Sequence, residues 1–441
     1  MNKTSPFPVK LTFALLVAAA PLVSPGGLRA QELSAIEAKI VAYVEHHQEE
    51  AIAFLEKVVN INSGTMNSEG VRRVGQFFRQ EFDALGFETR WVSMPDSVNR
   101  GGHLFAERRG SQGKRLLLIG HLDTVFEPES PFQRFERRDS IATGPGVNDM
   151  KGGDVVMLWA LKALHNAGVL ENTHIIVALH GDEEKIAAPI RLSRHDIIEA
   201  AKRSDMALAF EAEIGDMSSA RVARRGSSSW TLSVTGIRAH SSQIFKKRFG
   251  SGAIFEATRI LNSFHEELRG EQYLTFNPGV ILGGTEVVYD AARTRGTVFG
   301  KGNVIAQTVT VDGDLRFISE AQKERARQKM RDIVRQNLPG TSATISFRDK
   351  YTAMAPGAGN LALLELLDKV SRDLGYGPVE ALDPSLGGAA DIAFAAAHVE
   401  GGLDGLGAPG SGAHTTNEEA NLRALVKTTE RAALLIYRLT R

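Results

Sequence analysis

The feature that most constrains the fold is the alternation of apolar runs with helical patterns between residues 115 and 210. The first run, Arg115–Ile119, contains Leu-Leu-Leu-Ile, which is typical of a strand buried on both faces of a central sheet. The later segments are a helix at Lys151–Ala167, a strand at Ile175–Leu179, a helix at Ile190–Lys202 and a strand at Met206–Phe210. Strands that alternate with helices predict a largely parallel α/β sheet.

The pattern changes between residues 223 and 347. Strand and helix segments there follow the order β-α-β-β-α-β, which predicts a ferredoxin-like module. Strands are expected at Ser228–Thr235, Val304–Phe317 and Thr344–Phe347, with strand pieces at Tyr273–Thr275 and Val280–Tyr289, and helices at Ile254–Leu268 and Glu320–Leu338. A chain of 441 residues is too long for one ordinary core. We therefore expect an α/β domain of residues 31–222 and 348–441 with an inserted α+β domain of residues 223–347.

The N-terminal residues 1–30 have the pattern of a signal peptide. Lys3 and Lys10 precede the apolar stretch Leu11–Val23. As a helix this stretch reaches about 20 Å, short of the ~30 Å hydrocarbon core of a membrane. We expect cleavage after Ala30 and an exported protein, periplasmic or secreted. An uncleaved N-terminal anchor is the alternative, and no stable membrane span is expected in the mature form.

Composition excludes several classes of function. Lys and Arg together number 52, as do Asp and Glu. The net charge therefore supplies no attraction to nucleic acid, and no such partner is expected. The absence of cysteine excludes thiol catalysis and Cys-ligated zinc.

The strongest local signal is Gly-His-Leu-Asp, which contains His121 and Asp123 and closes the buried strand. In α/β folds, ligands bind at the carboxyl ends of parallel strands. A histidine there offers a nitrogen to a metal, and a carboxylate two residues later can fix its tautomer. A hydrogen-bonded pair that merely ends a strand is the alternative interpretation.

Acidic residues recur at later positions. Asp149 lies in the glycine-rich segment Gly144–Gly153, where its alternative role is to cap the helix that begins near Lys151. Glu183 and Glu184 follow Asp182 directly after a strand. Adjacent acids repel one another and a cation relieves that repulsion, although an acidic first turn of a helix has the same composition.

Two further candidates complete the set. Glu211 ends the next strand, and His414 lies in a glycine-rich loop before the last helix. Because His121, Glu184 and Glu211 each follow a predicted parallel strand, we expect all three at one edge of the same sheet. Imidazole and carboxylate ligands without thiolate suit catalytic zinc, or manganese and cobalt at similar sites.

Together these motifs resemble a known family. His-x-Asp, Gly-Pro-Gly…Asp-x-Lys-Gly-Gly, Asp-Glu-Glu and the late Gly-x-His are similar to those of the two-zinc hydrolases. That family includes bacterial glutamate carboxypeptidase, aminoacylase, the acetylornithine and succinyl-diaminopimelate deacylases and carnosinase-like dipeptidases. The resemblance implies a zinc-exopeptidase-like α/β catalytic domain with an inserted ferredoxin-like lid and dimerisation domain.

The resemblance also implies roles for the candidate residues. It implies two Zn²⁺ ions per subunit, with Mn²⁺ or Co²⁺ as alternatives. The implied ligands are His121 and Glu211 for one ion, Glu184 and His414 for the other, and Asp149 between them. By the same resemblance, Asp123 orients His121, and Glu183 is the general base.

Other residues are matched to the substrate. The resemblance implies that His240 reaches the site of the partner subunit in a homodimer formed through the lid, where it polarises the scissile carbonyl. It implies that Asn303 and Arg316 hold a substrate carboxylate. Gly387 and Gly388 are expected to add backbone N–H donors. Arg348 or Lys350 takes the place where an arginine contacts an acidic side chain in the family.

The function expected from the sequence is therefore a zinc exopeptidase that removes the C-terminal residue from a peptide or an N-acyl amino acid. A deacylase of small N-acyl amino acids with the same catalytic groups is the alternative. A metal- or solute-binding protein without turnover is a more remote alternative, which Glu183 argues against because a purely structural site needs no base.

Overall fold

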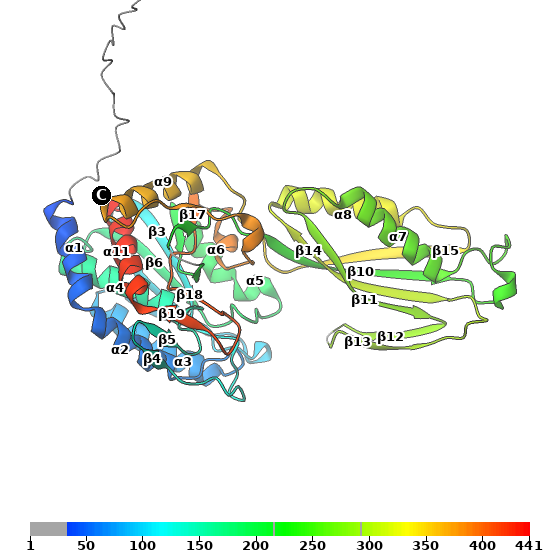
Figure 1. Ribbon diagram of the computed structural model, residues 1–441, viewed down its shortest axis with the longest axis horizontal. Helices are drawn as coiled ribbons and strands as arrows, with labels where there is room; N and C mark the ends of the chain where they lie inside the picture. The colour runs from blue at the N-terminus through cyan, green and yellow to red at the C-terminus, as the bar shows by residue number, and fades with distance from the viewer. Residues whose placement is uncertain (1–32, 215–216, 292) are drawn as a thin grey trace, which may run out of the picture.

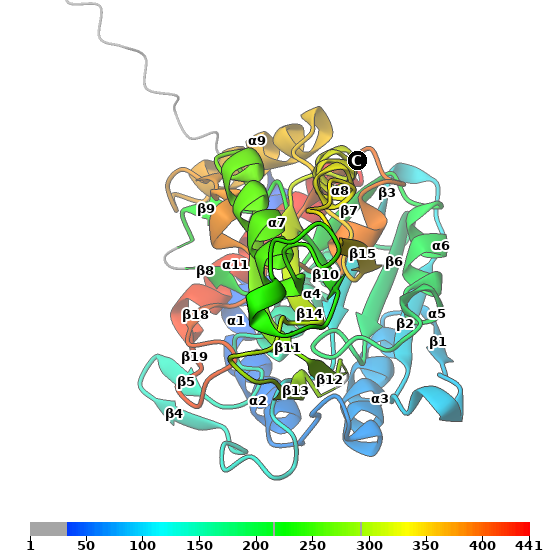
Figure 2. The same ribbon diagram turned by 90° about the vertical axis from the view of Figure 1, so that its right-hand side faces the viewer.

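The computed structural model describes residues 33–214, 217–291 and 293–441, and the expected signal peptide lies outside them. The chain forms two lobes that lie side by side (Figure 1). Turned by 90°, the smaller lobe stands in front of the larger one (Figure 2). None of the helices in the described part combines the length and apolarity that a membrane crossing needs.

The larger lobe is built on a six-stranded sheet. Its order is β1 (Glu88–Val92), β2 (His103–Arg108), β6 (Thr173–His180), β3 (Gln112–His121), β7 (Met206–Ala209) and β17 (Gly401–Leu403). Neighbours from β6 to β17 are parallel, whereas β2 is antiparallel to both of its neighbours. The predicted mainly parallel α/β fold is confirmed.

Helices cover both faces of this sheet, as the continuous apolar run predicted. Leu116 and Leu118 of β3 face the main core, and Leu117 and Ile119 face a second one. The main core is lined by α1 (Ala35–His46), α2 (Gln48–Val59), α3 (Ser68–Ala84), α4 (Lys151–Asn166), α9 (Ala358–Asp373) and α11 (Leu422–Leu439). The second core is covered by α6 (His195–Ala201) and α10 (Ile392–Ala395), with the short α5 (Ile190–Ser193) before α6.

The smaller lobe has an antiparallel sheet in the order β11 (Thr275–Gly284), β14 (Thr308–Phe317), β10 (Gly226–Gly236) and β15 (Thr341–Asp349). Its helices α7 (Ala253–Leu268) and α8 (Glu320–Val334) cover one face of this sheet (Figure 1). The chain order of these elements is the predicted β-α-β-β-α-β. A hairpin of β12 (Glu286–Asp290) and β13 (Arg295–Phe299) is added after β11.

A third, small sheet was not expected from the sequence. Its order is β4 (Glu136–Arg138), β5 (Ile141–Thr143), β19 (Glu419–Asn421), β18 (Pro409–Ser411) and β8 (Glu213–Ile214). The last helix starts only at Leu422, because residues 419–421 pair with β5 and the Asn421 side chain caps the helix. The remaining strands, β9 (Ser219–Ala220) and β16 (Glu380–Ala381), pair with each other.

Candidate metal centre

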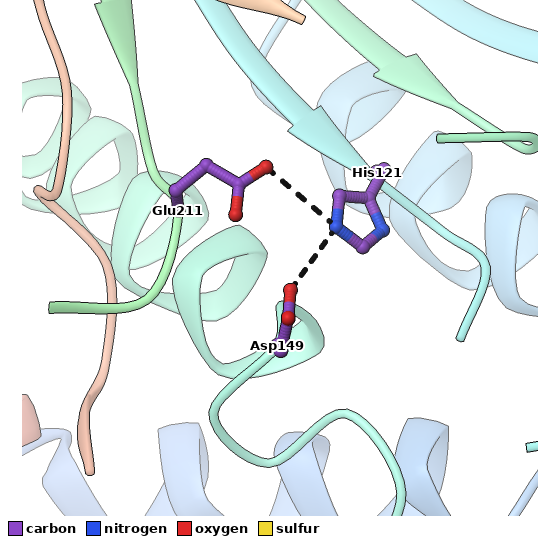
Figure 3. Close-up of side chains that lie close together, drawn as sticks. All are labelled: His121, Asp149 and Glu211. Atoms are coloured by element: carbon purple, nitrogen blue, oxygen red, sulfur yellow. Dashed lines mark ion pairs between the residues drawn. The ribbon is translucent and has the colours of Figure 1, made fainter. Parts of the chain in front are cut away.

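Three predicted ligands come from the carboxyl ends of neighbouring parallel strands. His121 is the last residue of β3, while Glu184 and Glu211 follow β6 and β7. The loop before α4 brings Asp149 to the same edge. His121 Nε2 lies 3.3 Å from Asp149 Oδ1 and 3.8 Å from Glu211 Oε1, so both carboxylates face the imidazole (Figure 3).

A second group of side chains lies on the other side of Asp149. His414 Nε2 is 3.1 Å from Asp149 Oδ2 and 3.1 Å from Glu184 Oε2. In each group the three ligand atoms all lie within 4.8 Å of one another. Asp149 therefore offers one carboxylate oxygen to each group.

The residues of both groups fit divalent metal ions. In the described structure, the buried atoms His121 Nε2 and Glu184 Oε1 make no hydrogen bond. Buried polar atoms without a partner are uncommon in native proteins. Imidazole nitrogens and carboxylate oxygens are ligands of zinc and of manganese. The donor set and the orphaned atoms therefore both match a metal centre.

The pKa values of these groups reflect the crowding of carboxylates in a buried place. Burial raises the pKa of Glu211 to about 8, and the negative charge of Asp149 adds to the shift. Hydrogen bonds to Asp149 and Glu184 raise the pKa of His414 to about 11. In the absence of metal, protons thus offset the repulsion that a cation would relieve.

Asp123 makes hydrogen bonds to His121 and to the backbone of Glu183 and Glu184. His121 Nδ1 lies 3.0 Å from the Asp123 backbone oxygen and 3.4 Å from its Oδ1, which leaves Nε2 free to face the carboxylates. The Asp123 carboxylate also accepts hydrogen bonds from Thr65 Oγ1 at 2.6 Å and from the backbone N–H of Glu183 and Glu184 at 3.0 and 3.2 Å.

Glu183 belongs to neither group of potential ligands. Its pKa is raised well above the ordinary value by burial and by the charge of Glu211. The Tyr351 hydroxyl donates to the Glu183 backbone oxygen at 2.7 Å and to its Oε1 at 3.2 Å. Glu183 also lines a cavity of about 600 Å³, together with Gly387 and Gly388. A carboxylate in this position can exchange a proton with a molecule bound there.

The structure does not show the alternative roles of these acidic residues. The N-cap of α4 is Met150, without a side-chain cap, so Asp149 does not cap that helix. Asp182 points away from the cavity and binds Ser193 Oγ and the Arg194 guanidinium. Of the three consecutive acidic residues, Asp182 is therefore paired with Arg194 inside the larger lobe, whereas Glu183 and Glu184 line the cavity.

Comparison with known proteins agrees with this geometry. The model of peptidase family M20/M25/M40 matches residues 117–438, which span both lobes and every potential ligand. The chain belongs to this family. It is thus a hydrolase of a family whose enzymes depend on metal ions.

The proteins that are similar to this chain carry the names of different hydrolases. Carboxypeptidase G2 of Pseudomonas sp. (strain RS-16) is 28% identical over 396 residues, which cover 88% of this chain and 89% of the relative. Succinyl-diaminopimelate desuccinylase of Pseudoalteromonas translucida is 24% identical over 305 residues, or 65% and 73% of the two chains. The crystal structure of aminopeptidase PepT from Bacillus cereus superposes with a TM-score of 0.68 at 18% identity, covering 89% of this chain and 99% of that one.

Glu418 is a residue of this M20/M25/M40 site that sequence reasoning missed. Its carboxylate accepts hydrogen bonds from the backbone N–H of Gly146 at 3.2 Å and of Asn148 and Asp149 at 3.0 Å each. Glu418 thereby holds the loop that presents Asp149. A glutamate four residues after His414, in the same loop, was the available signal.

Within one chain, the candidate residues His240 and Asn303 of the smaller lobe lie far from the third candidate, Arg316. Ser241 N, next to His240, donates to the Asn303 backbone oxygen at 2.9 Å. Both His240 and Asn303 lie beyond the Gly236 end of β10, roughly 30 Å along that strand from its start at ~3.3 Å per residue. Arg316 lies near that start, opposite Ser227, and its Nε donates to Asp314 Oδ2 at 2.7 Å.

Proposed function

We propose that this member of the M20/M25/M40 family is an exported exopeptidase with two Zn²⁺ ions, Mn²⁺ or Co²⁺ being the alternative ions. It would hydrolyse the C-terminal amide bond of peptides or of N-acyl amino acids. The observation that carries the proposal is the position of Asp149 between two groups of potential ligands. One ion would be held by His121 and Glu211, and the other by Glu184 and His414.

Glu183 is the proposed general base and acid. Ions held by these residues would supply Lewis-acid chemistry, which can lower the pKa of a water from about 15.7 to about 7. Glu183 accepts the proton from the attacking water at its carboxylate and then donates it to the leaving amine. The hydrogen bond from Tyr351 to Oε1 orients this carboxylate towards the cavity.

The proposal includes a homodimer formed through the smaller lobe. His240 lies roughly 30 Å along β10 from the end of the strand that follows Arg224, and Arg224 lines the cavity that contains Glu183. In the proposed dimer, His240 of the partner subunit polarises the scissile carbonyl, and the partner's Asn303 together with Arg316 of the same chain binds the substrate's terminal carboxylate. Gly387 and Gly388 line the same cavity and supply backbone donors. The apolar stretch Leu11–Val23 supports export.

Replacing Glu183 tests the proposed chemistry. Glu183→Gln keeps the size of the side chain but removes the proton acceptor, so we expect activity to fall by roughly 10²–10⁴-fold. Because Glu183 is outside both ligand groups, the variant should still bind two ions. Activity is measured on a panel of dipeptides and N-acyl amino acids, and metal content by elemental analysis.

The control is Glu199→Gln on the surface of α6, where Glu199 forms an ion pair with Lys202. Retained activity in Glu183→Gln would refute its role as the base. Turnover of N-acyl amino acids without any cleavage of dipeptides would favour the deacylase. Zinc-loaded wild-type protein that hydrolyses nothing in the panel would contradict the proposal as a whole.

A further inference from the structure

Leu386 is a large apolar side chain at the rim of the cavity beside the candidate metal centre. It lines the 600 Å³ cavity that also contains Glu183 and Glu211, and 64% of it is exposed. The other described residues that line this cavity are charged or polar, or are no larger than alanine. Leu386 is therefore the large apolar surface that a molecule bound in the cavity can cover.

The segment that carries Leu386 is fixed by its own hydrogen bonds. Leu386 ends the short 3-10 helix η3 (Pro384–Leu386), which proline opens. The Asp383 side chain accepts a hydrogen bond from Ser385 N at 2.7 Å, and Leu386 N donates to the Asp383 backbone oxygen at 3.0 Å. Arg225 Nη2 donates to the Ser385 backbone oxygen at 3.3 Å. A contact that is already ordered costs little entropy when a ligand binds.

The two glycines after Leu386 leave space beside it. A Cβ atom placed on Gly388 would meet nothing within 4 Å. Gly387 N donates to the Pro384 backbone oxygen at 3.4 Å, whereas Gly388 N donates to none of the groups that the structure describes. The Gly388 backbone oxygen accepts from Arg224 Nη1 at 3.3 Å, which holds the loop against the cavity wall. The loop therefore offers a backbone N–H and open space next to Leu386.

The arginines of the cavity bind other groups of the protein. Arg221 and Arg224 are buried, at 6% and 5% exposed, and each donates to a protein oxygen at 2.6 Å. Arg348 and Lys350, where the family resemblance suggested a contact with an acidic side chain, are exposed and do not line this cavity. Leu386 is thus more accessible to a substrate side chain than either guanidinium of the cavity.

We propose that Leu386 forms an apolar subsite for the side chain of the C-terminal residue that is released, so that the enzyme prefers an aliphatic or aromatic residue at this position to an acidic one. The inference rests on the proposed function, which places the backbone donors of this loop at the substrate. Backbone N–H groups bind anionic oxygens. The terminal carboxylate and the side chain are carried by the same Cα atom, so a loop whose Gly388 N–H binds the carboxylate also meets the side chain. Leu386 is the specificity-determining residue.

The test lengthens one side chain step by step. Dipeptides and N-acetyl derivatives that end in alanine, 2-aminobutyrate, norvaline, norleucine or glutamate are given to the zinc-loaded wild type. Burial of one methylene favours binding about fourfold. We therefore expect kcat/KM to rise about fourfold at each step of the aliphatic series until Leu386 is covered, and norleucine to exceed glutamate. Faster cleavage of the glutamate substrates than of the norleucine substrates would overturn the proposal.

Two variants separate specificity from structure. Leu386→Ala removes the apolar surface and should reduce the rise to less than about twofold per methylene, with little change for the alanine substrates. Leu361→Ala is the matched control, because Leu361 on α9 is 46% exposed and does not line the cavity. It should keep the full dependence on length. An equal loss on every substrate, or a dependence on length that persists in Leu386→Ala, would overturn the proposal.

Binding separates this inference from the proposed function. Calorimetry of the zinc-loaded protein with free norleucine and free alanine measures recognition without turnover. A protein that binds norleucine more tightly through Leu386 but hydrolyses nothing would contradict the proposed function alone. A protein that hydrolyses the whole series at equal rates would contradict the inference alone. Equal binding of both amino acids without any hydrolysis would contradict both.

Discussion

At the scale of single residues, the site depends on groups that position the potential ligands. Glu418 accepts three backbone hydrogen bonds from the loop that carries Asp149. In Glu418→Gln the amide nitrogen would face backbone N–H donors, so the loop would lose part of its support. We expect metal affinity to fall by about 10- to 100-fold, which is the usual loss when a residue that hydrogen-bonds to a metal ligand is replaced. Competition with a chelator measures this affinity.

The neighbouring Glu419→Gln is the matched control, since Glu419 accepts from Ser411 Oγ at 3.1 Å and does not contact the Asp149 loop. Both variants are compared with the wild type at the same pH. Equal metal affinity in all three proteins would show that the Glu418 hydrogen bonds do not support the site.

At the scale of elements, α9 and α11 are joined by a buried polar contact whose strength depends on pH. Glu430 in α11 is 1% exposed and accepts a hydrogen bond from the Tyr376 hydroxyl, just after α9. Burial raises the pKa of Glu430 to about 7. Below its unfolded value near 4.5, the carboxyl is protonated in both states. Above 4.5 the carboxyl loses its proton in the unfolded chain, whereas in the folded protein it keeps the proton until the pH reaches about 7. The free energy of unfolding therefore falls as the pH rises through 7.

Glu430→Gln removes this dependence, because the amide is neutral at every pH. We expect the variant to exceed the wild type in free energy of unfolding by about 3 kcal/mol at pH 8, at 1.36 kcal/mol per pKa unit, and to differ little near pH 4.5. Chemical denaturation at both pH values measures the difference. Glu365→Gln, on the exposed side of α9, is the control. A difference that does not grow with pH would show that Glu430 has an ordinary pKa.

At the scale of the whole molecule, the segments that connect the lobes contribute to the cavity. Arg224 and Met354 pair where the chain passes between the lobes, and Ser227 N donates to the Tyr351 backbone oxygen at 2.9 Å. Tyr351 also binds Glu183. The position of the smaller lobe is therefore linked directly to the proposed base.

The proposed dimer predicts complementation between two inactive variants. Glu183→Gln lacks the base, and His240→Ala lacks the histidine that would act in the partner subunit. A heterodimer of the two contains one complete site. Unfolding and refolding the mixture should therefore restore about a quarter of wild-type activity, because random pairing gives half heterodimers with one working site each. Activity and oligomeric state are measured together on the refolded sample.

Each variant refolded alone is the control and should stay inactive. A mixture that forms dimers without regaining activity would contradict the role of His240 in the partner's site. A protein that is monomeric at assay concentration would contradict the dimer itself.

The sequence alone predicted the α/β fold and the edge of the sheet at which the potential ligands lie. The run Leu116–Ile119 is apolar at every position, and this local pattern already requires a strand with both faces covered. Since parallel strands end at the same edge, the residues following β3, β6 and β7 were predicted to meet there. The β-α-β-β-α-β order of the smaller lobe was also readable from periodicity, apart from the hairpin of β12 and β13.

Only the tertiary structure decided which other residues complete the site. Glu418 and Asp149 are 269 positions apart, and Arg224 and Asp404 are 180 apart. Hydrophobic periodicity reports what one segment buries, but it carries no information about which distant polar group satisfies a backbone N–H or balances a guanidinium. Those pairings follow from the packing of the third sheet and the glycine loops against the strand ends. The same packing divides the acidic triplet, with Asp182 turned to Arg194 and Glu183 to the cavity.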